Sequence, residues 1–213
     1  MSNLAEVEEF CSRYHSAFTA SVEGAKATDR QGSSLPIGVN ISQLCEISSD
    51  LQKRNARQFI IGSGASAAFA DHMASDWTKN GGVATSSFGG SAWVTATAND
   101  LGVEQIFSAG LELHARSKDL LVAISSSGNS INITRAIEDA REKATKIVTL
   151  TGLAPTNPVR VMGDLNLYVP AKTYGMVEVE HQYLLHLWLD CYMGVVEWDR
   201  SIPQDMRSDS YIP

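Results

Sequence analysis

The feature that most constrains the fold is an apolar run that ends in a stretch of small hydroxyl residues. The segment Asp119–Ser130 reads DLLVAISSSGNS, and a helical pattern of apolar residues follows from Ile131. A buried strand that passes through serine and glycine into a helix presents unpaired N–H groups and the positive end of the helix dipole, which together favour an anion. The loop contains no Lys or Arg. The segment therefore predicts a phosphate-binding loop in which backbone N–H groups, the helix dipole and serine hydroxyls hold the anion. The alternative is a helix that is simply capped by Ser130.

The rest of the chain from Gln58 alternates in the same way. Strands are expected at Phe59–Ile61, Val83–Phe88, Leu120–Ile124, Lys146–Leu150 and Leu165–Val169. Helical periodicity covers Ser66–Lys79, Gln105–Ala115, Ser130–Lys143 and Val177–Val195. Nearly continuous apolar strands that are separated by helices indicate an α/β fold with a parallel sheet covered on both faces.

The N-terminal part is expected to be helical. Apolar residues recur at helical spacing over Leu4–Val22 and again over Ile41–Leu51, whereas Thr28–Asn40 is expected to be a connecting loop. Both helices precede the first strand, so we expect them to pack outside the sheet or against another subunit. The predicted organisation is an N-terminal helical part (residues 1–57), one α/β domain (residues 58–196) and a C-terminal tail (residues 197–213).

Composition excludes several classes of partner. The net charge is −7 and the isoelectric point is near 5.2, which argues against binding to nucleic acid or to an anionic membrane. No apolar run reaches the roughly 18 residues that a membrane-spanning helix needs. Cys11, Cys45 and Cys191 are scattered and odd in number, so we expect reduced core residues of a cytoplasmic protein.

A second glycine- and serine-containing loop follows the first predicted strand. Gly62–Ala67 (GSGASA) formally fits the dinucleotide pattern G-x-G-x-x-G/A, but the next strand, VATSSF, does not end in the acidic residue that would hold a ribose. Parallel strands place both loops at the same edge of the sheet, where such sheets bind ligands. The two loops together therefore predict a site for one small phosphorylated molecule.

Two helices carry residues that are typical of a metal site. His72 and Asp76 are four residues apart and share a helix face, and the helix Val177–Val195 contains Glu178, His181 and His186. Each histidine alone is compatible with a core or surface position. Together, His72, Asp76, Glu178 and His186 offer two imidazoles and two carboxylates, a set that suits zinc or another divalent ion. Spacing in the sequence does not establish that the four converge.

Several motifs resemble one known family. GSGAS, HMASD, the Ala98-Asn99-Asp100 triplet, ISSSGNS, REKATKIVTLTG and the terminal E…H…H helix resemble the sugar-isomerase (SIS) domain, and within it the phosphoheptose isomerases, over about Asn3–Val195. The resemblance implies a flavodoxin-like three-layer sandwich, a homotetramer with active sites between subunits, and one Zn²⁺ ion per site. It implies aldose–ketose isomerisation of a sugar phosphate, most simply sedoheptulose 7-phosphate.

The resemblance also implies roles for particular residues. It assigns the phosphate to Ser125, Ser126, Ser127 and Ser130. It assigns the sugar to Ser63, Gly64, Ser66, Asn99, Asp100 and Glu178. It assigns the metal to His72, Asp76, Glu178 and His186, with Asp76 as the base, His186 as the acid and Glu178 as the alternative base.

The chain departs from the family pattern near the substrate and the base. Gly175 stands where the family has an Asp, Asn80 where it has an Arg, and Asp76 and Glu178 replace a Glu and a Gln. Three alternatives stay open from the sequence: an isomerase of another sugar phosphate, a non-catalytic SIS scaffold like the relative that binds a replication initiator, and a sugar-phosphate-sensing regulator.

Overall fold

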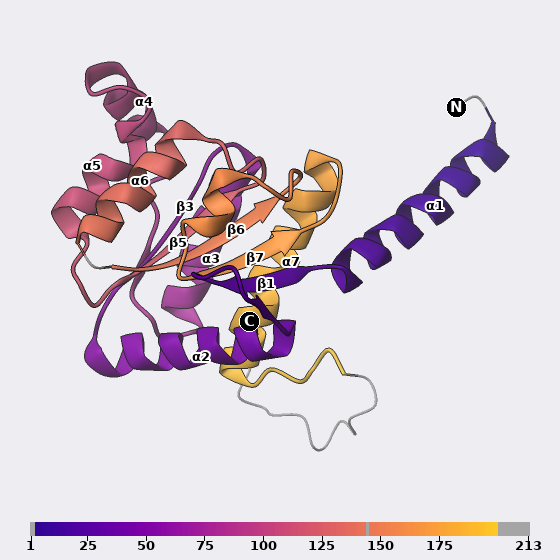
Figure 1. Ribbon diagram of the computed structural model, residues 1–213, viewed down its shortest axis with the longest axis horizontal. Coiled ribbons are helices and arrows are strands. Elements are labelled where there is room, and N and C mark those ends of the chain that lie inside the picture. The colour runs from indigo at the N-terminus through magenta and orange to yellow at the C-terminus, as the bar shows by residue number, and fades with distance from the viewer. Residues whose placement is uncertain (1–2, 144, 200–213) are drawn as a thin grey trace.

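The computed structural model describes residues 3–143 and 145–199, and its centre is a seven-stranded sheet (Figure 1). The sheet order is β2-β1-β7-β6-β5-β3-β4. The strands are β1 (Lys26–Asp29), β2 (Ser34–Leu35), β3 (Gln58–Gly62), β4 (Thr85–Ser86), β5 (Leu120–Ser125), β6 (Lys146–Gly152) and β7 (Leu165–Val169). The helices are α1 (Leu4–Glu23), α2 (Ile37–Arg54), α3 (Ala65–Lys79), α4 (Ser91–Asp100), α5 (Gln105–His114), α6 (Ile131–Glu142) and α7 (Tyr174–Met193), with a 3-10 turn at Pro158–Val161.

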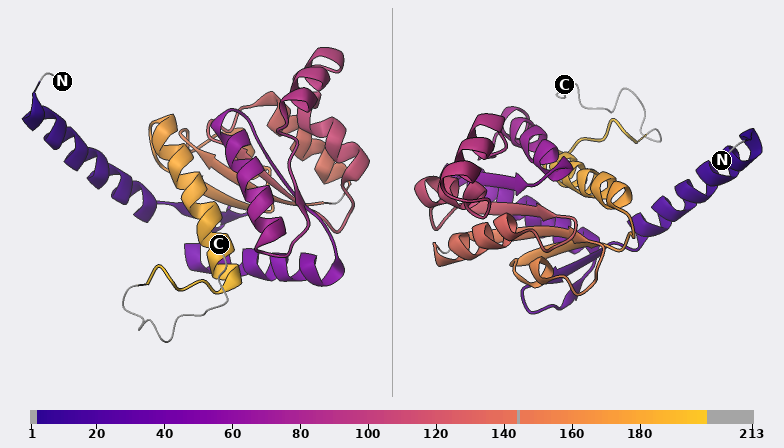
Figure 2. Two further views of the ribbon diagram at one scale, coloured as in Figure 1. Left: turned by 180° about the vertical axis from the view of Figure 1, so that it is seen from behind. Right: turned by 90° about the horizontal axis from the view of Figure 1, so that it is seen from above.

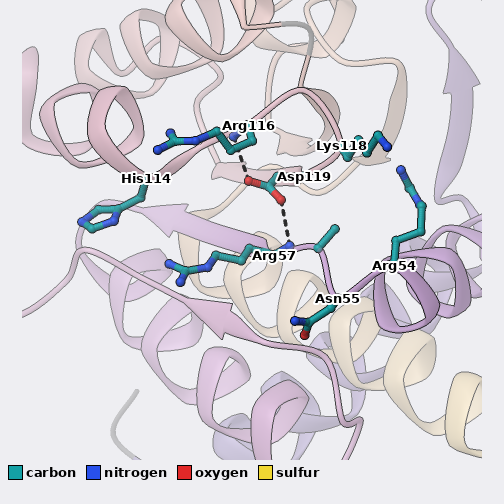
Figure 3. A pocket seen from close by; sticks show the side chains of 8 residues that line it. Arg54, Asn55, Arg57, His114, Arg116, Lys118 and Asp119 are labelled. Carbon is teal, nitrogen blue, oxygen red and sulfur yellow. Dashed lines mark hydrogen bonds between the residues drawn. The ribbon is translucent and has the colours of Figure 1, made fainter.

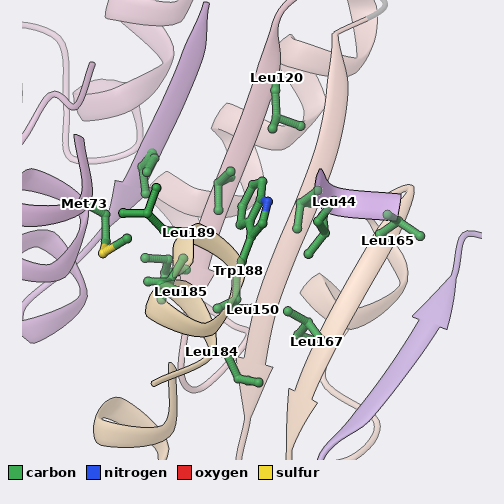
Figure 4. Close-up of a cluster of buried hydrophobic side chains, with 14 of the residues drawn as sticks. Leu44, Met73, Leu120, Leu150, Leu165, Leu167, Leu184, Leu185, Trp188 and Leu189 are labelled. Atoms are coloured by element: carbon green, nitrogen blue, oxygen red, sulfur yellow. The ribbon is translucent and has the colours of Figure 1, made fainter. Parts of the chain in front are cut away.

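The predicted parallel α/β architecture is confirmed for the five strands from β3 to β7, which pair in parallel. Apolar side chains alternate between two cores because successive residues of a strand point to opposite faces. Ile60 and Val122 belong to the core under α2, α3 and α7, whereas Phe59 and Leu121 belong to the core under α5 and α6. Figure 4 shows Trp188 of α7 lying against the sheet in the first of these cores.

The expectation of a plain loop over Thr28–Asn40 was wrong. Strand β1 pairs antiparallel with β7, and β2 pairs antiparallel with β1, so the N-terminal part supplies an edge hairpin to the sheet. Asp29 Oδ1 accepts the N–H groups of Gln31 and Ser33, and Gly32 takes a positive φ of 80°, which together close the turn. Strands of four and two residues are too short to show an alternating pattern in the sequence.

Two further elements differ from the prediction. The strand expected over Val83–Phe88 is limited to Thr85–Ser86, and the Ala/Thr-rich stretch that follows forms helix α4. The cysteines are not all core residues, because Cys11 and Cys191 are exposed and Cys45 is partly buried; all three are free thiols. Burial and the neighbouring Cys191 raise the pKa of the Cys45 thiol to about 12.

Helix α1 stands away from the body of the molecule (Figures 1 and 2). Its Leu4, Val7, Phe10 and Tyr14 side chains are exposed, and Ser21, near its C-terminal end, is buried and donates to Glu180 Oε2 at 2.6 Å. Helix α2, by contrast, packs on α7 in the core. Within the described residues, no helix combines the length and the apolar character needed to cross a membrane.

We expect the Trp188→Ala substitution to lower the free energy of unfolding by about 3–5 kcal/mol, because it empties a large buried volume. Trp188 is 1% exposed, lies 4.9 Å from the Trp77 ring centroid and donates to Ser48 Oγ. Urea denaturation measures the change. Trp198→Ala is the matched control, since Trp198 is 70% exposed, and its effect should stay within about 0.5 kcal/mol. Equal effects of the two substitutions would contradict this view of the core.

Candidate active site

The loops after β3 and β5 lie side by side at one edge of the sheet. The two strands pair in parallel, with Gly62 opposite Ile124, so their C-terminal ends coincide. After β3 the chain continues to β4 on one side, and it returns to β5 on the other side. This reversal is a topological switch point, which is where open parallel sheets bind ligands.

The serine loop leaves two backbone N–H groups at the start of α6 available. Ser130 is the N-cap residue, and its side chain makes no capping hydrogen bond. Its carbonyl accepts the N–H groups of Ile133 and Thr134. The N–H groups of Ile131 and Asn132 are therefore left without an intrahelical partner. Ser125 Oγ accepts the N–H of Gly128 at 3.1 Å and lies 3.4 Å from Ser130 Oγ. The Ser126 hydroxyl is buried and has no hydrogen-bond partner among the described residues. These groups make the loop neutral and rich in hydrogen-bond donors.

Gly128 is required for the shape of this loop. Its φ is +65°, and a Cβ at this position would lie 1.9 Å from Asn157 Oδ1. Asn157 is itself fixed, because its Nδ2 donates to the carbonyl groups of Gly152 and Ala154. The loop therefore packs directly on the segment that follows β6.

Asn132 connects the two loops, and the sequence did not single it out. Its side chain is buried in the first turn of α6, and its Nδ2 donates to Ser63 Oγ at 2.9 Å. The only hint in the sequence was a polar amide, Asn132, in the first turn of the predicted helix, on the face expected to be buried. In the first loop, Gly64 takes a φ of +63° at the start of α3, and Ser66 is 4% exposed against Gly62. Ser66 is thus buried beside Gly62, whereas Ser63 contacts the second loop through Asn132.

Helices α3 and α7 bring together three of the four predicted metal-type residues. His72 Nε2 lies 3.3 Å from Asp76 Oδ2, and the rings of His72 and His186 are 5.4 Å apart at their centroids. One ligand atom from each of His72, Asp76 and His186 lies within 4.8 Å of the others. Glu178 is outside this group, because it precedes His186 by two turns, or about 12 Å along the α7 axis.

Two residues beside His186 were missed by the sequence reasoning. Gln182 lies one turn before His186, with its Nε2 2.8 Å from His186 Nε2 and 3.5 Å from Met73 Sδ. Asp190 lies one turn after His186, and burial raises its pKa; His186 lowers this pKa, while Asp76 raises it. The i, i+4 spacing on α7 was the signal that could have revealed both residues.

Asn99 and Asp100 lie at the end of α4, where both are exposed. Asn99 Nδ2 donates to Asp100 Oδ1 at 2.7 Å. Among the hydrogen bonds of the described residues, none joins this pair to the serine loop or to the His72–Asp76–His186 group. A single chain therefore does not bring them to the other predicted site residues by direct contact.

His181, also on α7, has a structural position. It is fully buried, and its Nε2–H donates to the Thr151 carbonyl at 3.1 Å. Burial lowers the pKa of His181 to about 4, against a smaller opposing effect of that hydrogen bond. The ring is thus neutral at neutral pH and joins α7 to β6.

Comparison with known proteins agrees with this fold. Residues 38–152 match the SIS domain family. A phosphoheptose isomerase from Campylobacter concisus is 33% identical over 150 residues, which are 67% of this chain and 78% of that protein. One from Rhodospirillum rubrum is 37% identical over 134 residues, which are 59% and 70% of the two chains. The structure of phosphoheptose isomerase from Neisseria gonorrhoeae superposes with a TM-score of 0.76 at 25% identity, covering 87% of this chain and 99% of that one.

The chain belongs to the SIS domain family. Its similarity to the phosphoheptose isomerases confirms the expectation of an enzyme of the aldose–ketose isomerase class.

The low pKa of His181 predicts an acid-sensitive contribution to stability. Between pH 6.5 and about 4 the unfolded imidazole binds a proton that the folded one does not, so the free energy of unfolding falls as the pH falls through this window. The full effect is about 3 kcal/mol. Urea denaturation at a series of pH values should show a shallower decline for His181→Gln than for the wild type.

The exposed His15 supplies the control for this experiment, and His15→Gln should keep the wild-type pH dependence. Glu180, whose pKa burial raises, has the opposite dependence but is present in all three proteins, so it does not affect the comparison. An identical decline in His181→Gln and in the wild type would contradict the prediction.

Proposed function

We propose that this SIS-domain isomerase converts sedoheptulose 7-phosphate to D-glycero-D-manno-heptose 7-phosphate. The observation that carries the proposal is the pairing of β3 with β5, which sets a donor-rich serine loop beside a second polar loop in a chain related to phosphoheptose isomerases. The His72–Asp76–His186 group supplies acid–base side chains from α3, the helix that begins at that second loop, and from α7.

The serine loop holds the phosphate of the substrate. Ser125, Ser126, Ser127 and Ser130 provide hydroxyl donors, and the N-terminus of α6 provides backbone N–H groups and a favourable dipole. The loop has no cationic side chain, so the phosphate is bound without a full charge pair and is released readily. Ser63, Gly64 and Ser66 line the sugar on the other side.

A neighbouring subunit supplies the remaining contacts to the sugar. Asn99 and Asp100 are exposed at the end of α4, and Glu178 is partly buried near the start of α7. In a homotetramer with active sites between subunits, these three polar residues would reach a neighbouring chain's site. The exposed apolar residues of α1 supply surface for that assembly.

Asp76 and His186 carry out the proton transfers. The Asp76 carboxylate takes a proton from the hydroxyl-bearing carbon next to the carbonyl, and protonated His186 gives a proton to the carbonyl oxygen, which yields a neutral cis-enediol with one hydroxyl on each carbon. Asp76 then returns its proton to the former carbonyl carbon while His186 accepts the proton of the other hydroxyl, so the aldose carbonyl forms and both side chains regain their starting states. Gln182 positions the His186 ring through the 2.8 Å contact with Nε2. Glu178 is the alternative base if Asp76 serves only as a ligand.

The donor set also fits a divalent metal. His72, Asp76 and His186 offer two imidazole nitrogens and a carboxylate oxygen within 4.8 Å of one another, which suits zinc. Glu178, which lies outside this group in the single chain, is the candidate fourth ligand from a neighbouring chain. When bound, zinc polarises the carbonyl and stabilises negative charge on the substrate oxygens.

Incubation with sedoheptulose 7-phosphate, with aldose formation followed over time, tests the substrate and the base. We expect turnover by the wild type and a loss of at least about 100-fold in kcat/KM for Asp76→Asn, because the amide does not accept the proton. Asp71→Asn is the matched control on the same helix; Asp71 contacts Ser87 outside the site, so the activity should be unchanged. No turnover by metal-loaded wild type would end the heptose assignment.

Metal analysis of the purified protein tests the ligands separately from activity. We expect about one zinc ion per chain, and a loss of at least about tenfold in zinc affinity for His72→Ala, because one of the imidazole ligands is removed. His15→Ala, which removes an exposed histidine from α1, should retain the metal. Protein that lacks stoichiometric metal, or that binds it equally well without His72, would contradict the assignment.

A further inference from the structure

A basic cavity lies at the edge of the sheet opposite to the serine loop (Figure 3). It has a volume of about 410 Å³ and is lined by the segments that immediately precede β3 and β5. Its lining residues include four permanent cations, Arg54, Arg57, Arg116 and Lys118. In Figure 3, Arg54 and Lys118 extend toward each other from different segments, and Arg57 and Arg116 run in the same direction toward His114. A concentration of positive charge is unexpected in a chain of net charge −7.

The single carboxylate of the cavity, Asp119, forms no ion pair with these cations. Asp119 is 6% exposed, and its two oxygens accept the backbone N–H groups of Arg57 and Arg116, each at 2.8 Å. These bonds tie the two segments together and turn the carboxylate toward the backbone. The guanidinium and ammonium groups are left facing the cavity.

Local contacts account for the positions of two of the four cations, and the other two have no partner among the described residues. Arg54 lies in the last turn of α2, where the helix dipole favours a cation, and it pairs with Asp50. Arg116 donates to the carbonyl groups of Leu113 and Ala115. Arg57 and Lys118 lie outside helices, and in the described part of the chain their side chains have no hydrogen-bond or ion-pair partner. Positive groups that share one cavity without a partner repel each other in the free protein, and a bound anion would relieve this repulsion.

The basic surface continues into a second cavity of about 460 Å³ that shares Arg54, Lys118 and Asp119. This cavity adds Arg30, Arg141 and Lys146, and its further carboxylate, Asp164, pairs with Arg141 at 2.7 Å and with Arg30 at 3.9 Å. Lys146 makes no ion pair among the described residues. The two cavities together thus hold three cations without an ion-pair partner among the described residues: Arg57 lines the first cavity, Lys146 lines the second and Lys118 lines both.

We propose that these joined cavities bind a small molecule that carries a chain of phosphate groups. Cations that are spread over two adjoining cavities match several linked phosphates better than a single one, and arginine forks bind phosphate oxygens in pairs. The volumes are those of small-molecule sites. Strands of five and six residues separate this edge from the serine loop, about 17–20 Å away. The inference shares no residue with the proposed isomerase site, so either can fail without the other.

Calorimetric titration of the full chain with inorganic tripolyphosphate tests the proposal. We expect saturable binding of one anion per chain, with affinity that falls as salt rises. Arg57→Ala and Lys118→Ala should each weaken binding at least about fivefold, because each removes a charged donor. Lys53→Ala is the matched control, since Lys53 is exposed next to Arg54 but lines neither cavity, and its effect should be less than about twofold.

Two further titrations test whether the anion binds here rather than at the serine loop or at the candidate metal group. Binding should persist with saturating sedoheptulose 7-phosphate and in His72→Ala, whereas displacement by the sugar phosphate would overturn the proposal. ATP and tripolyphosphate distinguish the two sources of a phosphate chain: tighter binding of ATP identifies a nucleotide, and equal binding identifies the phosphate chain alone. An absence of saturable binding, unchanged affinity in Arg57→Ala, or equally tight binding of inorganic monophosphate would overturn the proposal.

Discussion

The parallel pairing of β3 with β5 is the interaction on which the rest of the structure depends. It places Gly62 beside Ile124, so that two loops rich in small residues leave the sheet at one point. Asn132 then joins them through Ser63, and α3 and α6 begin there. The same pairing sets the starts of both strands side by side at the other edge, where Asp119 binds the backbone of both incoming segments. One strand pair thus organises both ends of the sheet.

The sequence predicted the parts of the fold that have a clear period. The strand expected at Leu120–Ile124 and the helix expected from Ser130 occur at Leu120–Ser125 and Ile131–Glu142, because a buried strand and an amphipathic helix leave strong patterns. The β1–β2 hairpin was missed because its pairing with β7 is a long-range contact. Helix α4 was missed because its many Ala and Thr residues give no clear alternation between apolar and polar positions.

The site was predictable in its residue types but not in its geometry. The i, i+4 pair of His72 and Asp76 follows from helix spacing, yet only the packing of α3 against α7 brings His186 beside them. Asn132, Gln182 and Asp190 have ordinary polar side chains in the sequence, and their relevance comes from what they contact. The family resemblance supplied roles that no spacing could supply, and the roles of all the site residues remain predictions.

Two carboxyl groups, those of Asp76 on α3 and Asp190 on α7, lie near His186. Asp76 is shorter than a glutamate, so it sits close to its helix and to His72. Asp190 adds a second carboxyl group on the other helix, and burial and Asp76 together raise its pKa. His186 therefore has two roles in the proposed chemistry: it belongs to the candidate metal group with His72 and Asp76, and it is the candidate acid. One ring thus links the proposed metal site to the proposed proton transfers.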